Sequence, residues 1–218
     1  MNATDHRERM AQFLNAGLYL VTSQPLSAGR RTLDIVEQAL NGGVRLIQLR
    51  EKELSTASFT ALAHEVRVLT GARDALFIVN DRLDVALSVG ADGVHLGQDD
   101  LPVAEARRLA PELIIGASTH SEEELQAAQA AGASYVNIGP LFPTRTKEWT
   151  GAYLGWEGLE RLARIATVPY TVMGGIKNSH IPELTKKGVR TIAVVTAVTG
   201  AAQPEQAARD LLTLIRKH

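Results

Sequence analysis

The regular alternation of short apolar runs with longer amphipathic stretches constrains this chain more than any other feature. Eight runs rich in β-branched and aliphatic residues have the length of buried strands. They span residues 18–22, 44–49, 76–79, 93–96, 113–115, 135–138, 169–172 and 191–195. Because strands separated by helices pair in parallel, the pattern predicts a parallel sheet with helical crossovers.

The stretches between these runs carry apolar residues three and four positions apart, which is typical of amphipathic helices. Ser55 is a predicted N-cap for a helix over 55–69. Ser121 and Glu124 form a capping-box pattern for a helix over 121–131. Pro204 predicts the first turn of a last helix over 204–215. Residues 4–15 predict an additional helix before the first strand.

Eight strand–helix units in 218 residues fit a closed (β/α)8 TIM barrel of the α/β class. We expect a single domain over residues 1–218, with the extra N-terminal helix across the bottom of the barrel. The alternative is an open doubly wound sheet, which carries a glycine-rich turn directly after its first strand. Residues 22–25 read Thr-Ser-Gln-Pro, so the sequence favours the barrel.

Composition narrows the class of partner. The net charge is −1, which favours neither nucleic acid nor a membrane surface as a partner. The absence of cysteine excludes disulfides and thiolate sites. No apolar run is long enough to cross a bilayer and the N-terminus lacks an apolar signal core, so we expect a cytoplasmic protein.

Since aromatic residues make up only 5%, we expect aliphatic side chains to build the core.

Polar or glycine-rich segments follow seven of the eight predicted strands. In a TIM barrel the C-terminal strand ends form the active site, so these segments predict an enzyme. After the second strand, alternation places Gln48, Arg50 and Lys52 on one face. Two cations and an amide suit a ligand rich in anionic oxygens. The alternative is a buried structural network with Glu51.

Two carboxylates follow the next strands. Asp81 and Asp100 lie on successive loops, and beside a diphosphate such oxygen ligands suit Mg²⁺. Two alternatives stay open at this point. Asp81 could instead cap a helix over 83–87. Asp99 could replace Asp100 as the ligand, or it could simply cap the next helix.

The longest loop, over 139–155, carries Thr144, Thr146 and Lys147, whose hydroxyl and ammonium groups bind phosphate oxygens well. We expect its part over 142–155 to close over the site, with Gly151 allowing the motion. Its aromatic residues Trp149 and Tyr153 either join that closure or pack on the rim, and we favour packing.

A second anion site is expected after strands seven and eight, the usual phosphate site of these barrels. Gly174 and Gly175 permit close approach of a phosphate, and Val195 and Thr196 add backbone amides. Two such sites would suit two phosphorylated substrates.

No protein nucleophile is evident. Ser118 and His120 follow the fifth strand without the Gly-x-Ser-x-Gly elbow of a hydrolase. His95 fits a hydrogen-bonded filler within the fourth strand.

In these motifs the chain closely resembles the thiamine phosphate synthases, over about residues 17–212. The likeness rests on the order of Gln48-x-Arg50-x-Lys52, Asn80-Asp81-Arg82, Asp92-Gly93-Val94-His95-Leu96-Gly97-Gln98-Asp99-Asp100, Gly116-x-Ser118-x-His120, Gly139-Pro140-x-Phe142-x-Thr144-x-Thr146-Lys147 and Gly174-Gly175-Ile176. The resemblance implies a transferase that joins 4-amino-5-hydroxymethyl-2-methylpyrimidine diphosphate to the phosphate of 4-methyl-5-hydroxyethylthiazole, releasing pyrophosphate.

The resemblance also implies residue roles and a Mg²⁺ cofactor. Asp81 and Asp100 hold the metal, and Arg50, Lys52, Ser118 and Lys147 are the expected catalytic groups. The substrate-binding set implied by the resemblance is Gln48, Arg50, Lys52, Asn80, Ser118, Thr144, Thr146, Lys147, Gly175, Val195 and Thr196.

Two alternative functions follow from the same residues. One is the related thiazole tautomerase, which can use a histidine where His120 stands and does not need the diphosphate and metal set. The other is a non-catalytic phosphate-binding barrel, which would not need Asp81, Asp100 and Lys147 together. A homo-oligomer is compatible with the sequence, which does not fix the oligomeric state.

Overall fold

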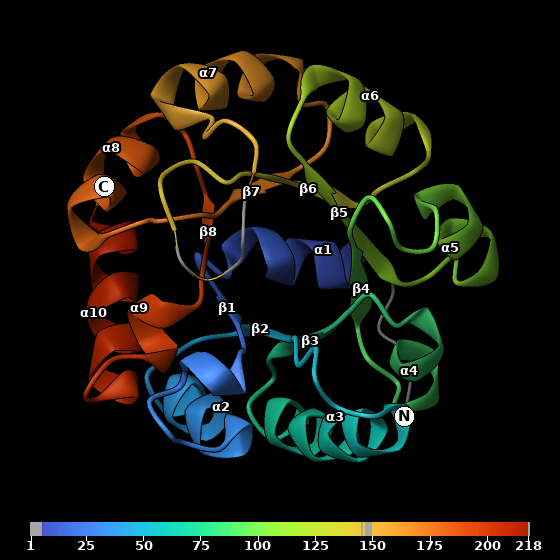
Figure 1. The fold of residues 1–218 in the computed structure, drawn as a ribbon, viewed down its shortest axis with the longest axis vertical. Helices are drawn as coiled ribbons and strands as arrows, with labels where there is room; N and C mark the ends of the chain where they lie inside the picture. Colours follow the sequence, from blue (N-terminus) through green and yellow to red (C-terminus); the bar gives the residue numbers. More distant parts are fainter. Residues whose placement is uncertain (1–5, 145, 147–149, 218) are drawn as a thin grey trace.

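The computed structural model describes residues 6–144, 146 and 150–217. Its parallel strands close into one barrel in chain order, with the last strand paired to the first (Figure 1). The strands are β1 (Leu18–Val21), β2 (Leu46–Leu49), β3 (Leu76–Asn80), β4 (Gly93–Leu96), β5 (Ile114–Thr119), β6 (Tyr135–Ile138), β7 (Tyr170–Val172) and β8 (Thr191–Val194). This closed order confirms the predicted TIM barrel and excludes the open doubly wound sheet.

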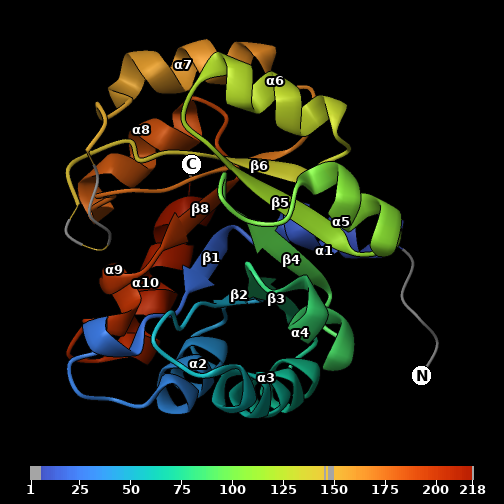
Figure 2. The same ribbon diagram turned by 45° about the vertical axis from the view of Figure 1, so that its right-hand side comes forward.

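The helices form a ring around the strands, and α1 lies across the centre of that ring (Figure 1). Turning the molecule shows α1 behind β4 and β5 (Figure 2). The helices are α1 (His6–Asn15), η1 (Gln24–Leu26), α2 (Thr32–Asn41), α3 (Thr56–Gly71), α4 (Leu83–Ser88), α5 (Val103–Leu109), α6 (Glu122–Ala130), α7 (Gly155–Ile165), η2 (Asn178–His180), α8 (Ile181–Lys186), α9 (Thr196–Thr199) and α10 (Pro204–Arg216). Within the described ranges, no helix has the length and apolar character needed to span a membrane.

The predicted helix starts are largely confirmed. Ser55 caps α3 by accepting a hydrogen bond from the Ser58 amide at 3.2 Å. Ser121 caps α6 in the same way through the Glu124 amide. The Glu124 carboxylate does not complete a capping box, because it accepts instead from the amide and Nδ1 of His120.

β5 is longer than the sequence predicts, since it continues to Thr119 where we expected an end at residue 115. Residues 116–119 are small and have weak strand propensity, so their pattern resembles a loop. Pairing with β4 on one side and β6 on the other holds them extended. As a result Ser118 lies within the strand and faces the barrel interior, opposite Asn137 of β6.

The core has two layers of different composition. Between strands and helices it is built almost entirely from Val, Ile, Leu and Ala, as expected. Inside the barrel most of the buried residues are aliphatic too, but they pack with three aromatic rings, those of Phe13, Tyr19 and Tyr135. Phe13 of α1 inserts from the bottom and lies 4.4 Å from Tyr135 between ring centroids. A few large rings therefore close the barrel floor beneath the polar rim.

Gly116 makes room for one of these rings. A Cβ atom at Gly116 would lie 2.2 Å from Cζ of Tyr135, closer than any real contact allows. Glycine at this position of β5 therefore leaves room for the Tyr135 ring inside the barrel.

Candidate active site

A cavity of about 270 Å³ opens at the C-terminal ends of the strands. It is lined by all the described residues predicted for the site, namely Gln48, Arg50, Lys52, Asn80, Asp81, Asp100, Ser118, Thr144, Thr146, Gly175, Val195 and Thr196. Lys147 lies outside the described residues. The fold thus brings strand ends from β2 to β8 around one space, while the individual roles of these residues stay predictions.

The end of β2 presents polar groups to the cavity in the predicted alternation. Gln48 is buried on the inner face, and Arg50 follows on the same side. The Arg50 guanidinium makes no hydrogen bond or ion pair with any other described residue. Glu51 instead accepts hydrogen bonds from Thr32 Oγ1 and the Gln24 amide, both at 2.8 Å. The alternative of a structural network joining Glu51 to this face is therefore wrong, and no described residue occupies the Arg50 guanidinium.

Asp81 and Asp100 face each other at the rim. Asp81 has φ +61°, a left-handed conformation that aspartate tolerates better than most residues. Its carboxylate is paired with the Lys52 ammonium. Burial, followed by a hydrogen bond that protonated Asp100 can donate to the Asp81 carboxylate, raises the pKa of Asp100. Two carboxylates held this close repel each other, and a cation or a proton would relieve that repulsion.

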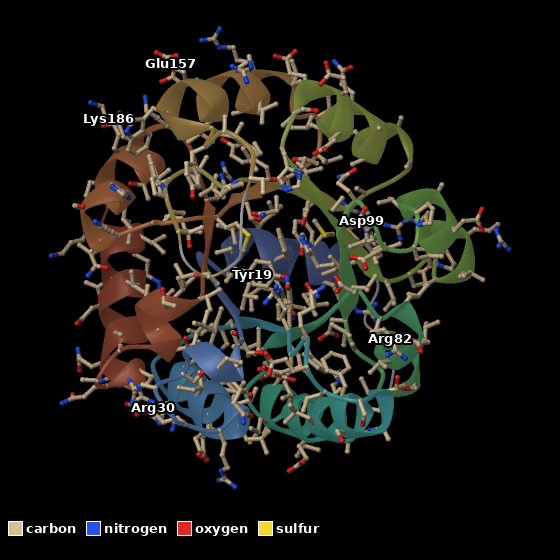
Figure 3. The ribbon with its side chains drawn as sticks, in the orientation of Figure 1. Tyr19, Arg30, Arg82, Asp99, Glu157 and Lys186 are labelled. Atoms are coloured by element: carbon tan, nitrogen blue, oxygen red, sulfur yellow. The ribbon has the colours of Figure 1, made fainter. Side chains whose placement is uncertain are left out.

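The structure decides the helix-capping alternatives for these carboxylates. The N-cap residue of α4 is Arg82 rather than Asp81, so the predicted capping role of Asp81 is wrong. Asp99 is exposed but lines the same cavity, near the start of the β4–α5 connection on the right of Figure 3, so Asp99 as the ligand stays an alternative. The N-cap of α5 is Pro102, so Asp99 does not cap that helix either.

A chain of hydrogen bonds crosses the floor of the cavity beneath these groups. Gln48 Nε2 donates to the Tyr19 hydroxyl at 2.6 Å, and Tyr19 lies 2.9 Å from the Tyr135 hydroxyl. The Tyr135 hydroxyl lies 2.8 Å from Nδ1 of His95, whose Nε2 is 3.0 Å from Ser118 Oγ. Figure 3 places Tyr19 near the barrel centre. His95 is therefore hydrogen-bonded, as expected, and it also connects the floor to Ser118.

Burial controls ionisation along this chain. Desolvation raises the pKa of both Tyr19 and Tyr135 above the ordinary tyrosine value. It lowers the pKa of His95 to about 4. At neutral pH all three side chains are therefore uncharged.

Gly174 and Gly175 serve the fold in a way that the sequence did not indicate. Both have positive φ, at +99° and +61°. A Cβ at Gly174 would lie 2.5 Å from Cβ of Pro140, and one at Gly175 would lie 2.4 Å from the Pro143 carbonyl oxygen. The glycines thus admit the loop after β6, where we had expected them to make space for a phosphate. Gly175 still lines the cavity, next to Val195 and Thr196 at the start of α9.

The loop after β6 is described only in part. Thr144 Oγ1 accepts from the Thr146 amide at 3.2 Å, so the two hydroxyls lie side by side at the cavity. Phe142 packs edge-on against Trp156, with ring centroids 5.1 Å apart. Tyr153 is 39% exposed, and Trp149 lies outside the described residues. Closure of residues 142–155 stays a prediction.

The family model for thiamine monophosphate synthase matches residues 18–198, which include all eight strands and the cavity. The chain belongs to this family. Among the curated relatives, the thiamine-phosphate synthase of Archaeoglobus fulgidus is 44% identical over 96% of this chain and 97% of its own length. That of Chloroflexus aurantiacus is 41% identical over 94% and 95% of the two chains.

Solved structures agree with this assignment. The thiamine phosphate pyrophosphorylase from Pyrococcus furiosus superposes with a TM-score of 0.86 at 38% identity, covering 94% of this chain and 98% of that one. A 3-hexulose-6-phosphate synthase superposes with a TM-score of 0.64 at 21% identity over 90% of this chain and 99% of its own. The second likeness shows the shared barrel fold alone.

Sequence reasoning missed one residue that lines the cavity of this thiamine monophosphate synthase family member, Asn137, and two that lie beneath it, Tyr19 and Tyr135. Tyr19, Tyr135 and Asn137 lie inside strands, so an inspection of strand ends passes over them. Asn137 is buried, accepts a hydrogen bond from Thr171 Oγ1 at 2.8 Å, and lines the cavity. The available signal was a polar residue within the apolar run 135–138, on the same face as Tyr135.

Proposed function

We propose that this chain is a thiamine phosphate synthase that acts as one catalytic domain over residues 1–218. It joins a hydroxymethylpyrimidine diphosphate to a thiazole phosphate and releases pyrophosphate. The observation that carries this proposal is the convergence, in one cavity, of the available Arg50 guanidinium with the facing carboxylates of Asp81 and Asp100. Such an arrangement suits a diphosphate neutralised from both sides, by a cationic side chain and by a metal ion.

Mg²⁺ fits the carboxylate pair. Among the described residues no group of three or more His, Cys, Asp or Glu side chains is placed to hold a metal. Mg²⁺ commonly takes only one or two carboxylates and completes its shell with waters and substrate phosphates. We therefore assign it to Asp81 and Asp100, where it would supply charge neutralisation for a diphosphate. Burial and then the contact with Asp81 raise the pKa of Asp100, and a cation bound between the two carboxylates would lower it.

The side chains of this chain bind and orient the two substrates. Arg50, Lys52 and Lys147 hold the diphosphate and stabilise the charge that develops on it as its bond to the pyrimidine CH₂ breaks. Ser118, Thr144 and Thr146 add hydroxyl donors. The amino group of the pyrimidine stabilises the resulting cation, and the thiazole nitrogen attacks it. No protein nucleophile is needed, so the protein contributes positioning and exclusion of water.

The remaining substrate contacts follow from position in the cavity. Gln48 and Asn80 lie at the ends of β2 and β3 and hold the pyrimidine diphosphate. Backbone groups of Gly175, Val195 and Thr196 bind the thiazole phosphate. The cytoplasmic location and the formation of a homo-oligomer stay predictions.

Pyrophosphate release from the purified full-length protein tests this function. We expect release only when both substrates and Mg²⁺ are present, with thiamine phosphate as the second product and loss of release on adding a chelator. A folded protein that releases no pyrophosphate under these conditions would overturn the proposal. Thiazole isomerisation without metal, abolished in His120→Ala, would then identify the tautomerase. Binding of inorganic phosphate with no turnover of either kind would identify a non-catalytic barrel.

A further inference from the structure

The hydrogen-bond chain on the cavity floor has a direction, which is set at its Gln48 end. An amide nitrogen can only donate, so the Tyr19 hydroxyl oxygen accepts from Gln48 Nε2. Tyr19 is 1% exposed, and among the described residues its hydroxyl forms hydrogen bonds only with Gln48 and Tyr135. Its proton therefore goes to Tyr135, because a buried hydroxyl proton without an acceptor is strongly disfavoured.

The hydrogen bonds run in the same direction from Tyr135 to His95. The Tyr135 oxygen accepts from Tyr19, so its own proton goes to Nδ1 of His95 at 2.8 Å. Because Nδ1 accepts this proton, it carries no hydrogen of its own, and the ring has a single proton. That proton must lie on Nε2, from which it is donated to Ser118 Oγ at 3.0 Å. The reverse direction would leave Tyr19 with two donors and no acceptor for its own proton.

Ser118 is the last residue in this series of hydrogen bonds, and it lies at the cavity. Its oxygen is occupied by the His95 proton, which leaves the hydroxyl proton of Ser118 without a partner among the described residues. Its backbone is held in place as well, because Gln98 Nε2 donates to the Ser118 carbonyl at 2.6 Å. A hydroxyl fixed in this way can donate only into the cavity, toward the space shared with Arg50 and Lys52.

We propose that Tyr19, Tyr135 and His95 are positioning residues that fix His95 as the Nε2–H tautomer and so make Ser118 an oriented donor to an anionic oxygen of the diphosphate. This inference rests on the proposed function for the identity of the acceptor. The tautomer itself is a property of the protein without substrate. An oriented hydroxyl stabilises the transition state more than a freely rotating one does. No free energy is spent on orienting it during the reaction.

The tautomer is tested by nitrogen NMR on protein carrying ¹⁵N-labelled histidine, without substrate. The chain has six histidines, and the His95 signals are those that disappear in His95→Gln. We expect a protonated Nε2 and an unprotonated Nδ1 in the wild-type protein. Tyr135→Phe removes the donor to Nδ1 and should shift that nitrogen signal. Tyr170 is half-buried and its hydroxyl takes no part in these hydrogen bonds. Tyr170→Phe is therefore the matched control and should leave the Nδ1 signal unchanged. A protonated Nδ1 in the wild type would overturn the proposal.

Kinetics separate positioning from a merely structural role. We expect Tyr135→Phe and Ser118→Ala each to lower kcat by about tenfold or more, with little change in KM. The double variant should lose no more than Ser118→Ala alone, because Tyr135 acts through Ser118. Additive losses would contradict the proposal. If the wild type shows no turnover, the proposed function fails, whereas the NMR measurement still decides the tautomer.

Discussion

The carboxylates of Asp81 and Asp100, which come from loops after different strands, face each other closely enough to share a hydrogen bond. Lys52 neutralises Asp81, and the Gly97 amide donates to Asp100 at 2.7 Å. The Gly97 amide and Lys52 do not fully offset the effects of burial and of Asp81, so the pKa of Asp100 is raised. The pair is therefore prepared to accept positive charge.

Removing either carboxylate should weaken Mg²⁺ binding. We expect Asp81→Asn and Asp100→Asn each to raise the Mg²⁺ concentration needed for half-maximal pyrophosphate release by at least about tenfold. Titration of Mg²⁺ at saturating substrates measures this. Asp34→Asn, which removes an exposed carboxylate of α2, is the charge-matched control and should change nothing. A loss in Asp99→Asn with none in Asp100→Asn would mean that Asp99 is the ligand.

His95 should make the stability depend on pH. Burial lowers its pKa to about 4, whereas in the unfolded chain it takes up a proton below about pH 6.5. The unfolded state therefore binds the extra proton, and the free energy of unfolding decreases as the pH is lowered through this window. From about pH 7 to about pH 5 the loss is about 2 kcal/mol.

The comparison with His95→Gln isolates this contribution. Urea unfolding at both pH values gives the loss for each protein, and contributions from the carboxylates cancel in the difference. We expect His95→Gln to lose less stability than the wild type. Equal losses would show that His95 titrates normally in the folded protein.

Filling the space at Gly116 should strain the barrel floor. In Gly116→Ala the new methyl group would meet the Tyr135 ring, and we expect a loss of about 1–3 kcal/mol in the free energy of unfolding. Gly71→Ala, at the end of α3 with no atom near its Cβ position, should be neutral or stabilising. Urea unfolding of both variants checks this prediction, and equal stabilities would contradict it.

Asp92 should anchor the bottom of the barrel. It is buried and accepts hydrogen bonds from the Phe77 amide at 2.8 Å and from Arg67 at 2.9 Å, and Arg9 of α1 lies 3.7 Å away. Asp92→Ala leaves these donors without their acceptor, so we expect a loss of about 3–5 kcal/mol.

The exposed Asp84 provides the control for Asp92. It forms a surface pair with Arg82, so Asp84→Ala should cost no more than about 1 kcal/mol. A similar cost for Asp92→Ala would show that the buried cluster contributes little. Chemical unfolding followed by circular dichroism measures both.

Much of the barrel could be predicted because strand and helix periods are local properties. The alternation of apolar runs predicted all eight strands, and Ser55 and Ser121 were identified as caps from their spacing to the following turn. The end of β5 could not be predicted, because the small residues before Thr119 become extended only through pairing with β4 and β6. For the same reason Ser118 was expected in a loop.

The sequence alone determined the closed barrel and the rim at which Arg50, Asp81 and Asp100 meet, because parallel strands point their C-terminal ends to one side. Only the tertiary structure decided how the floor beneath them is built. Tyr19 and Tyr135 are 116 positions apart, and their contact depends on strand register, on Gly116 and on Phe13 of α1. Contacts between distant residues inside a barrel have no local period, so no pattern along the chain predicts them.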